Sequence, residues 1–119
     1  MSLVVYEYEK CSTCRNAIKW LDSHKVSYKK VPIVDEPPTF EQLKDFVARS
    51  GLPITKFFNT SGVVYREMKL GDKLPVMSDN EKLKLLASEG KLIKRPLAVS
   101  SAGVLLGFRE EDYKKAFAK

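Results

Sequence analysis

Two cysteines three positions apart are the residues in this sequence best suited to chemistry. Cys11 and Cys14 are the only cysteines, and they form a C-x-x-C motif between an apolar segment and a helical pattern. In a chain without a recognisable export signal, such a pair indicates redox chemistry more readily than a structural disulfide bond. Cys11 would lie at or just before a helix N-terminus, where free N–H groups and the helix dipole stabilise a thiolate. We therefore predict that Cys11 is a nucleophile.

Cys14 follows one helical turn later, which predicts a second role. It is close enough in sequence to attack a mixed disulfide or a sulfenic acid formed on Cys11. Lys10 and Arg15 add positive charge beside the predicted thiolate. The spacing thus predicts Cys14 as the resolving cysteine of a reversible disulfide.

Two other readings of the cysteines remain open. A closed zinc site needs about four ligands, whereas the chain offers the two cysteines and one histidine, His24. Such a site would require a partner chain or carboxylates, so we expect no metal and predict His24 as a surface or capping residue. Buried, inert cysteines are the second alternative because free cysteine is often part of a core.

The elements that would position this pair begin with a β-α-β pattern in the first 35 residues. Residues 3–8 are β-branched and aromatic, which predicts a buried strand. Helical spacing of apolar residues starts at Cys14, and a second strand is predicted over residues 26–34. Two prolines at positions 37 and 38 end it.

The middle of the chain is predicted to be helical. Residues 39–42 and 78–81 each match a capping box, and each opens a helix that should end near a glycine, the second at Gly90. Pro53 suits the first turn of a short helix reaching residue 58, and residues 59–62 have turn chemistry.

The last part returns to sheet. Residues 95–100 and 104–108 flank Ser-Ala-Gly, which predicts a hairpin, and residues 110–119 form an amphipathic helical pattern. The economical fold for this order is an α/β domain over residues 1–119, with one small mixed sheet and helices packed on it. In thioredoxin-like folds a cis-proline packs beside the C-x-x-C turn, and Pro96 falls at that place. A trans proline opening an edge strand is the alternative.

Composition excludes several classes of protein. The 44% hydrophobic content excludes wholesale disorder, and no apolar run approaches the roughly 20 residues of a membrane span. The net charge of +6 suits an anionic substrate or partner. The lysines are scattered beside acidic residues, however, rather than gathered in a stripe, so we expect no direct nucleic-acid binding. Without an export signal, we expect a cytoplasmic protein.

Five segments in order resemble the ArsC/Spx family over nearly the whole chain: residues 11–16, 36–39, 57–62, 95–97 and 106–108. The resemblance implies a thioredoxin-like (glutaredoxin-like) core over residues 1–35 and 91–119 with a helical insert over residues 36–90. It also implies one of two activities. Some members are arsenate reductases, whereas Spx-type members are redox-switched regulators that bind the C-terminal domain of the RNA polymerase α subunit.

The family's residues match this sequence unevenly. Cys11 matches the cysteine that attacks arsenate, and Arg95 matches the arginine before the proline. A second expected arginine falls on the neutral Asn59, and a third falls near Arg109. Cys14 stands where single-cysteine reductases have a small hydroxyl residue, which favours a two-cysteine branch.

We therefore predict a thiol-dependent oxidoreductase resembling arsenate reductase. Its disulfide or oxyanion substrate would be held by the turn at Ser12 and Thr13, by Arg15 and by Arg95, with Pro96 structural beside the site. No cofactor would be bound, and thioredoxin or glutathione/glutaredoxin would be the external reductant. The alternative is an Spx-like regulator that binds RNA polymerase.

Overall fold

The computed structural model describes residues 3–117, which form two compact units. The first combines the segment up to Pro32 with the segment from Arg95 onward, and we call it the sheet unit. The second is Ile33–Lys94, which we call the helical unit. In the part of the chain described here, no helix combines the length and apolar character needed to span a membrane.

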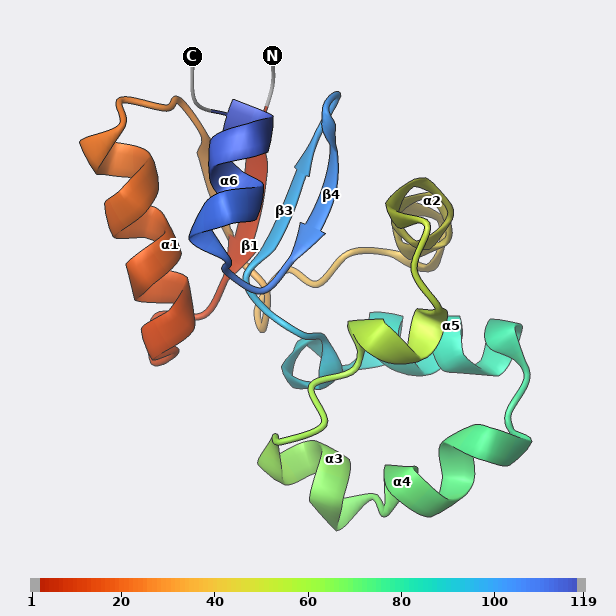
Figure 1. The fold of residues 1–119 in the computed structure, drawn as a ribbon. Helices are drawn as coiled ribbons and strands as arrows, with labels where there is room; N and C mark the ends of the chain where they lie inside the picture. Colours follow the sequence, from red (N-terminus) through yellow and green to blue (C-terminus); the bar gives the residue numbers. More distant parts are fainter. Residues whose placement is uncertain (1–2, 118–119) are drawn as a thin grey trace. The chain divides into compact units, whose positions relative to one another are not determined.

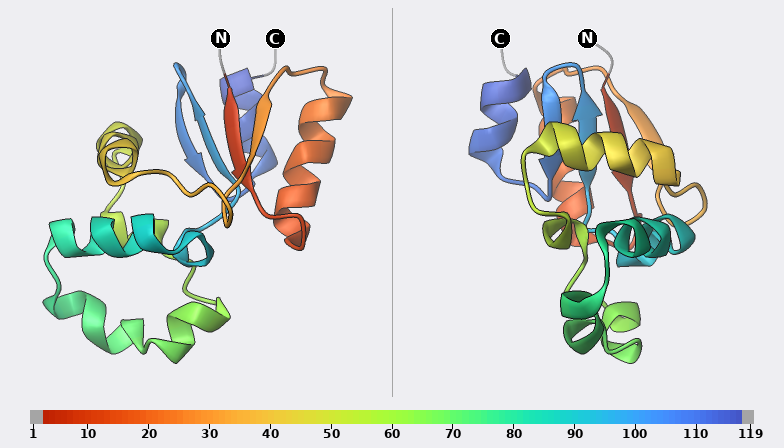
Figure 2. Two further views of the ribbon diagram at one scale, coloured as in Figure 1. Left: turned by 180° about the vertical axis from the view of Figure 1, so that it is seen from behind. Right: turned by 90° about the vertical axis from the view of Figure 1, so that its right-hand side faces the viewer.

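The sheet unit contains a four-stranded sheet in the order β2-β1-β3-β4 (Figure 2). The strands are β1 (Val4–Glu7), β2 (Lys29–Pro32), β3 (Leu97–Ser100) and β4 (Gly103–Leu106). β1 pairs with β2 in parallel, and the other two pairings are antiparallel. This arrangement confirms the predicted α/β class with a small mixed sheet.

Two helices, α1 (Ser12–Ser23) and α6 (Glu110–Phe117), pack on one face of this sheet (Figure 1). Val5 and Ala98 are opposite each other in the β1–β3 pairing and therefore point to the same face. They join residues of both helices in one apolar cluster, because the apolar positions of each helix recur on one side. The cluster comprises Leu3, Val5, Ala17, Trp20, Leu21, Ala98, Tyr113 and Phe117.

The predicted second strand is longer than the observed one. The Val26 N–H donates to the Leu21 carbonyl at 2.9 Å, and Lys25 has a φ of 56°, so the chain is still closing the end of α1 there. Pairing with β1 begins only at Lys29. The first helix begins at Ser12, two residues before the helical spacing of apolar residues becomes visible at Cys14.

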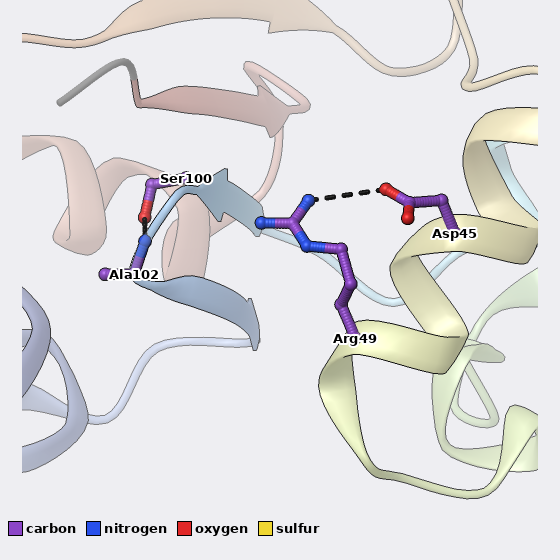
Figure 3. A network of polar contacts seen from close by, with 4 residues as sticks. All are labelled: Asp45, Arg49, Ser100 and Ala102. Carbon is purple, nitrogen blue, oxygen red and sulfur yellow. Dashed lines mark hydrogen bonds and ion pairs between the residues drawn. The ribbon is translucent and has the colours of Figure 1, made fainter.

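The predicted hairpin is confirmed with a shifted boundary. Gly103 pairs with Ser100 and opens β4, so it belongs to the strand rather than to the turn. The Ala102 N–H donates to Ser100 Oγ at 3.1 Å and stabilises the turn (Figure 3).

The helical unit consists of short helices, with α2 and α5 packed against each other. Its α-helices are α2 (Phe40–Ser50), α3 (Val63–Glu67), α4 (Leu70–Lys73) and α5 (Asp79–Ser88), and its 3₁₀ helices are η1 (Ile54–Phe57), η2 (Leu74–Val76) and η3 (Gly90–Leu92). On the exposed side of α2, Asp45 and Arg49 form an ion pair at 3.4 Å (Figure 3).

Both predicted capping boxes are present. The Gln42 N–H donates to Thr39 Oγ1 at 3.2 Å, and the Thr39 N–H donates to Gln42 Oε1 at 2.9 Å. Ser78 and Glu81 make the same reciprocal pair of bonds at the start of α5. Because these bonds involve residues only three apart, the local sequence is enough to specify them.

Two details of the helical unit differ from the prediction. The short helix after Pro53 is 3₁₀, with Pro53 as its N-cap rather than in its first turn. The helix that begins at Asp79 ends at Ser88, and Gly90 opens η3 instead of closing α5. Gly90 packs closely against the backbone of Ile33, since a Cβ placed there would overlap the Ile33 carbonyl oxygen.

Candidate active site

Cys11 is the N-cap of α1, as its position in the sequence predicts. Its φ and ψ of −98° and 116° are extended, and its Sγ accepts a hydrogen bond from the Cys14 backbone N–H at 3.3 Å. Its own N–H donates to the Tyr8 carbonyl at 3.0 Å, which fixes the loop after β1. The side chain is half-buried. A thiolate here would accept a backbone donor at the positive end of a helix dipole.

Cys14 lies in a different environment although it is only three residues away. Its side chain is 1% exposed. Burial raises the pKa of this thiol to about 12, and the hydrogen bond to Cys11 adds to that rise, while a hydrogen bond from the Tyr8 backbone and the charge of Arg95 oppose it. Cys14 therefore keeps its proton near neutral pH. Both cysteines are free thiols in the structure.

The first turn of α1 presents polar groups beside Cys11. Ser12 and Thr13 are exposed, and their backbone N–H groups belong to the first turn of the helix, where intrahelical acceptors are missing. Arg15 Nη1 donates to the Glu9 carbonyl at 3.0 Å, which holds its guanidinium near the loop that leads to Cys11. The turn can thus offer donors and positive charge to an anion.

Arg95 and Pro96 reach the same unit from the far end of the sequence. The Arg95–Pro96 peptide bond is cis, as the thioredoxin-like placement of this proline predicts, and the trans alternative is not observed. The Pro96 carbonyl accepts a hydrogen bond from the Gly107 N–H at 2.8 Å, just before β3. The Arg95 Cζ lies 4.9 Å from the centroid of the Tyr8 ring.

The positions matched to the other two family arginines are Asn59 and Arg109. Asn59 belongs to the helical unit, where its N–H donates to the Leu92 carbonyl at 2.7 Å and its Oδ1 accepts from Ser61 Oγ at 3.3 Å. Arg109 directly precedes α6, its carbonyl accepts from the Tyr113 N–H at 3.1 Å, and its side chain is exposed.

Sequence reasoning missed two tyrosines around the pair. Tyr8 falls in the predicted strand over residues 3–8, although it is the aromatic residue nearest the motif. Tyr113 falls in the predicted helix over residues 110–119, whose pattern marks it only as apolar. It is fully buried, its hydroxyl donates to the Gly107 carbonyl at 3.4 Å, and its pKa is raised by burial and by the nearby Cys14.

The geometry gives no assembled set of metal ligands. Among residues 3–117, no group of three or more His, Cys, Asp or Glu side chains is close enough to hold an ion. His24 is the C-cap of α1, as predicted, and its ring stacks on Trp20 with centroids 4.0 Å apart.

The comparisons with known proteins agree with this architecture. The sequence model of the ArsC family matches residues 6–116. A crystal structure of an ArsC family related protein from Bacteroides fragilis has a TM-score of 0.94 and 50% identity, with 98% of each chain covered. A crystal structure described as a possible arsenate reductase from Streptococcus mutans UA159 has a TM-score of 0.87 and 44% identity, covering 94% of this chain and 97% of that one.

Among curated proteins, the uncharacterized protein YusI of Bacillus subtilis (strain 168) is 48% identical over 118 residues, with 99% of this chain and 100% of YusI covered. The regulatory protein MgsR of the same organism is 27% identical over 98% of this chain and 91% of MgsR. The relatives therefore include a protein described as a possible arsenate reductase and a protein named as a regulator, and the solved structures share the thioredoxin-like fold predicted here.

Proposed function

The chain belongs to the ArsC family, and from this premise we propose that it is a thiol-dependent oxidoreductase with Cys11 as nucleophile and Cys14 as resolving cysteine. The observation that carries the proposal is the difference between the two thiols. Cys11 is half-buried at a helix N-terminus and accepts a backbone N–H, whereas Cys14 is buried with a raised pKa. The Cys11 sulfur therefore has a backbone donor, whereas the Cys14 sulfur is held as a thiol.

The proposed cycle uses these two sulfurs as the source of both electrons. The Cys11 thiolate attacks the arsenic of arsenate, and an oxygen leaves as water after protonation. The Cys14 sulfur, as it loses its proton, then attacks Cys11 Sγ. A Cys11–Cys14 disulfide forms, the sulfur–arsenic bond breaks, and arsenic leaves in its trivalent state with the electron pair.

The substrate class follows from the charges around the pair. The donors of the first turn of α1, together with Arg15 and Arg95, suit an oxyanion. Replacing one expected arginine by Asn59 removes a charge-assisted contact, a loss of about 1.5–3 kcal/mol that weakens oxyanion binding without abolishing it. We place the cycle in the cytoplasm without a bound cofactor, and the external reductant is thioredoxin or glutathione/glutaredoxin.

The test is arsenate-dependent NADPH oxidation by the purified protein. It is run with thioredoxin and thioredoxin reductase, and separately with glutathione, glutaredoxin and glutathione reductase. Turnover that is lost in Cys11→Ser supports the reductase, and dependence on Cys14 in the thioredoxin system alone supports the internal disulfide. Absence of turnover in both systems removes arsenate as the substrate.

A second candidate is an Spx-like redox-switched regulator, which the similarity to MgsR over 98% of this chain favours. In this case the same disulfide would change a protein contact instead of completing a turnover. Binding to the C-terminal domain of the RNA polymerase α subunit, measured with the oxidised and the reduced protein, tests it. Equal lack of binding in both forms would contradict the regulator.

A further inference from the structure

Tyr8 contacts both halves of the proposed site. It directly follows β1, and its carbonyl accepts the Cys11 N–H at 3.0 Å. Its ring lies under the Arg95 guanidinium, with the Arg95 Cζ 4.9 Å from the ring centroid. This separation is within the roughly 6 Å at which a guanidinium is attracted to an aromatic face. One residue therefore touches the nucleophile's backbone and the cationic side chain.

The contact with the Tyr8 ring helps the Arg95 side chain to act as a fixed charge. The backbone of the next residue is held by the hydrogen bond between the Gly107 N–H and the Pro96 carbonyl. The side chain itself has many rotamers, and ordering them costs free energy. A ring on one face of the guanidinium restricts these rotamers and leaves the in-plane N–H donors directed sideways, which is the geometry that oxyanions and carboxylates bind.

The guanidinium is also within electrostatic reach of the cysteine pair. Arg95 acts on the Cys14 thiol in the direction that favours its charged form, against the larger effect of burial. Cys14 lies directly beside Cys11, since its backbone N–H donates to Cys11 Sγ at 3.3 Å.

We propose that Tyr8 is a positioning residue, whose ring holds the Arg95 guanidinium beside the Cys11–Cys14 pair so that the Cys11 thiolate reacts preferentially with anionic partners. The proposal rests on the proposed function only in taking Cys11 as the nucleophile. It does not depend on arsenate being the substrate.

The test compares two alkylating reagents that differ in charge. Iodoacetate is an anion and iodoacetamide is neutral, and both react when the thiolate displaces iodide and forms a carbon–sulfur bond. The ratio of their second-order rate constants reports the positive charge near Cys11. Mass spectrometry of the digested protein identifies the alkylated residue as Cys11 rather than the buried Cys14.

The expected ratios follow from the contacts. Arg95→Gln should lower the ratio about fivefold, the effect of one unit charge at a few ångströms in water. Tyr8→Leu should lower it about two- to fivefold because the guanidinium loses the ring face on which it lies. Tyr8→Phe should keep the wild-type ratio because the ring face remains. Tyr28→Leu is the control, an aromatic residue of the same unit whose hydroxyl bonds Asp22 at 2.8 Å, and it should also keep the ratio.

The double variant separates positioning from a merely structural role. If the ring acts through the guanidinium, Tyr8→Leu should have no further effect on the ratio once Arg95→Gln is present. A structural defect would change both rate constants together and leave their ratio unchanged. A wild-type ratio in Tyr8→Leu, a lowered ratio in Tyr8→Phe, or no effect of Arg95→Gln would each overturn the proposal.

These outcomes are independent of the proposed enzyme cycle. A shifted ratio without arsenate turnover would retain Tyr8 as a positioning residue and remove the reductase. Arsenate turnover with an unshifted ratio would support the reductase and would remove Tyr8 as a positioning residue.

Discussion

In the sheet unit, strands from both ends of the sequence pair with each other, whereas the helical unit is one continuous stretch, Ile33–Lys94. The sheet unit contains the two cysteines and Arg95, so residues far apart in the chain meet around a single turn. In the helical unit, two capping boxes whose bonds span three residues begin the two longest helices, α2 and α5. We infer that the reactivity of Cys11 depends on the pairing of distant segments in the sheet unit. The helical unit contributes mainly to the free energy of unfolding. Four changes test this division.

The largest expected effect is on chemistry in the sheet unit. Cys11→Ser should reduce turnover in the coupled NADPH assay by at least about a thousandfold, the order expected when a nucleophile is removed. Its thermal unfolding midpoint should change little because the side chain is only half-buried. Turnover above a tenth of the wild-type rate would contradict the role of Cys11 and the division between the units.

The second change affects stability in the helical unit. Gly90→Ala should lower the free energy of unfolding by about 2–3 kcal/mol, because the new Cβ would overlap the Ile33 carbonyl oxygen and the backbone has to move. Gly71→Ala is the matched control, since its Cβ would meet only the Tyr65 hydroxyl at 3.9 Å. Urea denaturation measures both. Equal stability of the two variants would show that the contact at Gly90 is not restrictive.

The third change returns to the buried thiol. Burial raises the pKa of Cys14 from 9.0 to about 12, so between these values the folded chain binds a proton that the unfolded chain has lost. The free energy of unfolding should therefore fall as pH rises through this range, by at most about 1.4 kcal/mol per pH unit for one proton.

Cys14→Ala isolates this effect because all other titrating groups are shared. The contribution is fully present below about pH 9 and is lost toward pH 12, so the variant should show a shallower decline above pH 9. Urea denaturation between about pH 8 and pH 10, with a reductant present, compares the slopes. Parallel slopes would show that Cys14 ionises as easily in the folded chain as in the unfolded one.

The smallest expected effect concerns a cap of the helical unit. Thr39→Ala removes the acceptor of the Gln42 N–H and should cost about 1 kcal/mol of stability. Thr60→Ala, in the exposed turn before Gly62, should change stability by less than about 0.5 kcal/mol. Iodoacetamide should alkylate Cys11 at the wild-type rate in both variants. A slower reaction in Thr39→Ala would mean that the helical unit supports the site.

What the sequence predicts correctly depends on how far apart in the chain the contacting residues are, and this holds in both units. The capping boxes at Thr39 and Ser78 were predicted correctly because their bonds span three residues. The second strand was predicted too long because the turn that closes α1 includes Lys25 with its positive φ. The residues of this turn show no pattern of apolar and polar positions that distinguishes them from a strand. The role of Gly90 was missed because its neighbour, Ile33, lies far away in the sequence.

By itself, the sequence determined the C-x-x-C motif at the start of a helix, the position of Cys11 as the N-cap, the mixed sheet and the family. These features depend on residue type and on spacings of a few residues. Only the tertiary structure decided that Cys14 is fully buried while Cys11 is half-buried, that Arg95 lies over Tyr8, and that Tyr113 is fully buried near Cys14. Burial and ring contacts arise when β3 and α6 pack beside β1 and α1, and no local spacing encodes the distances that result.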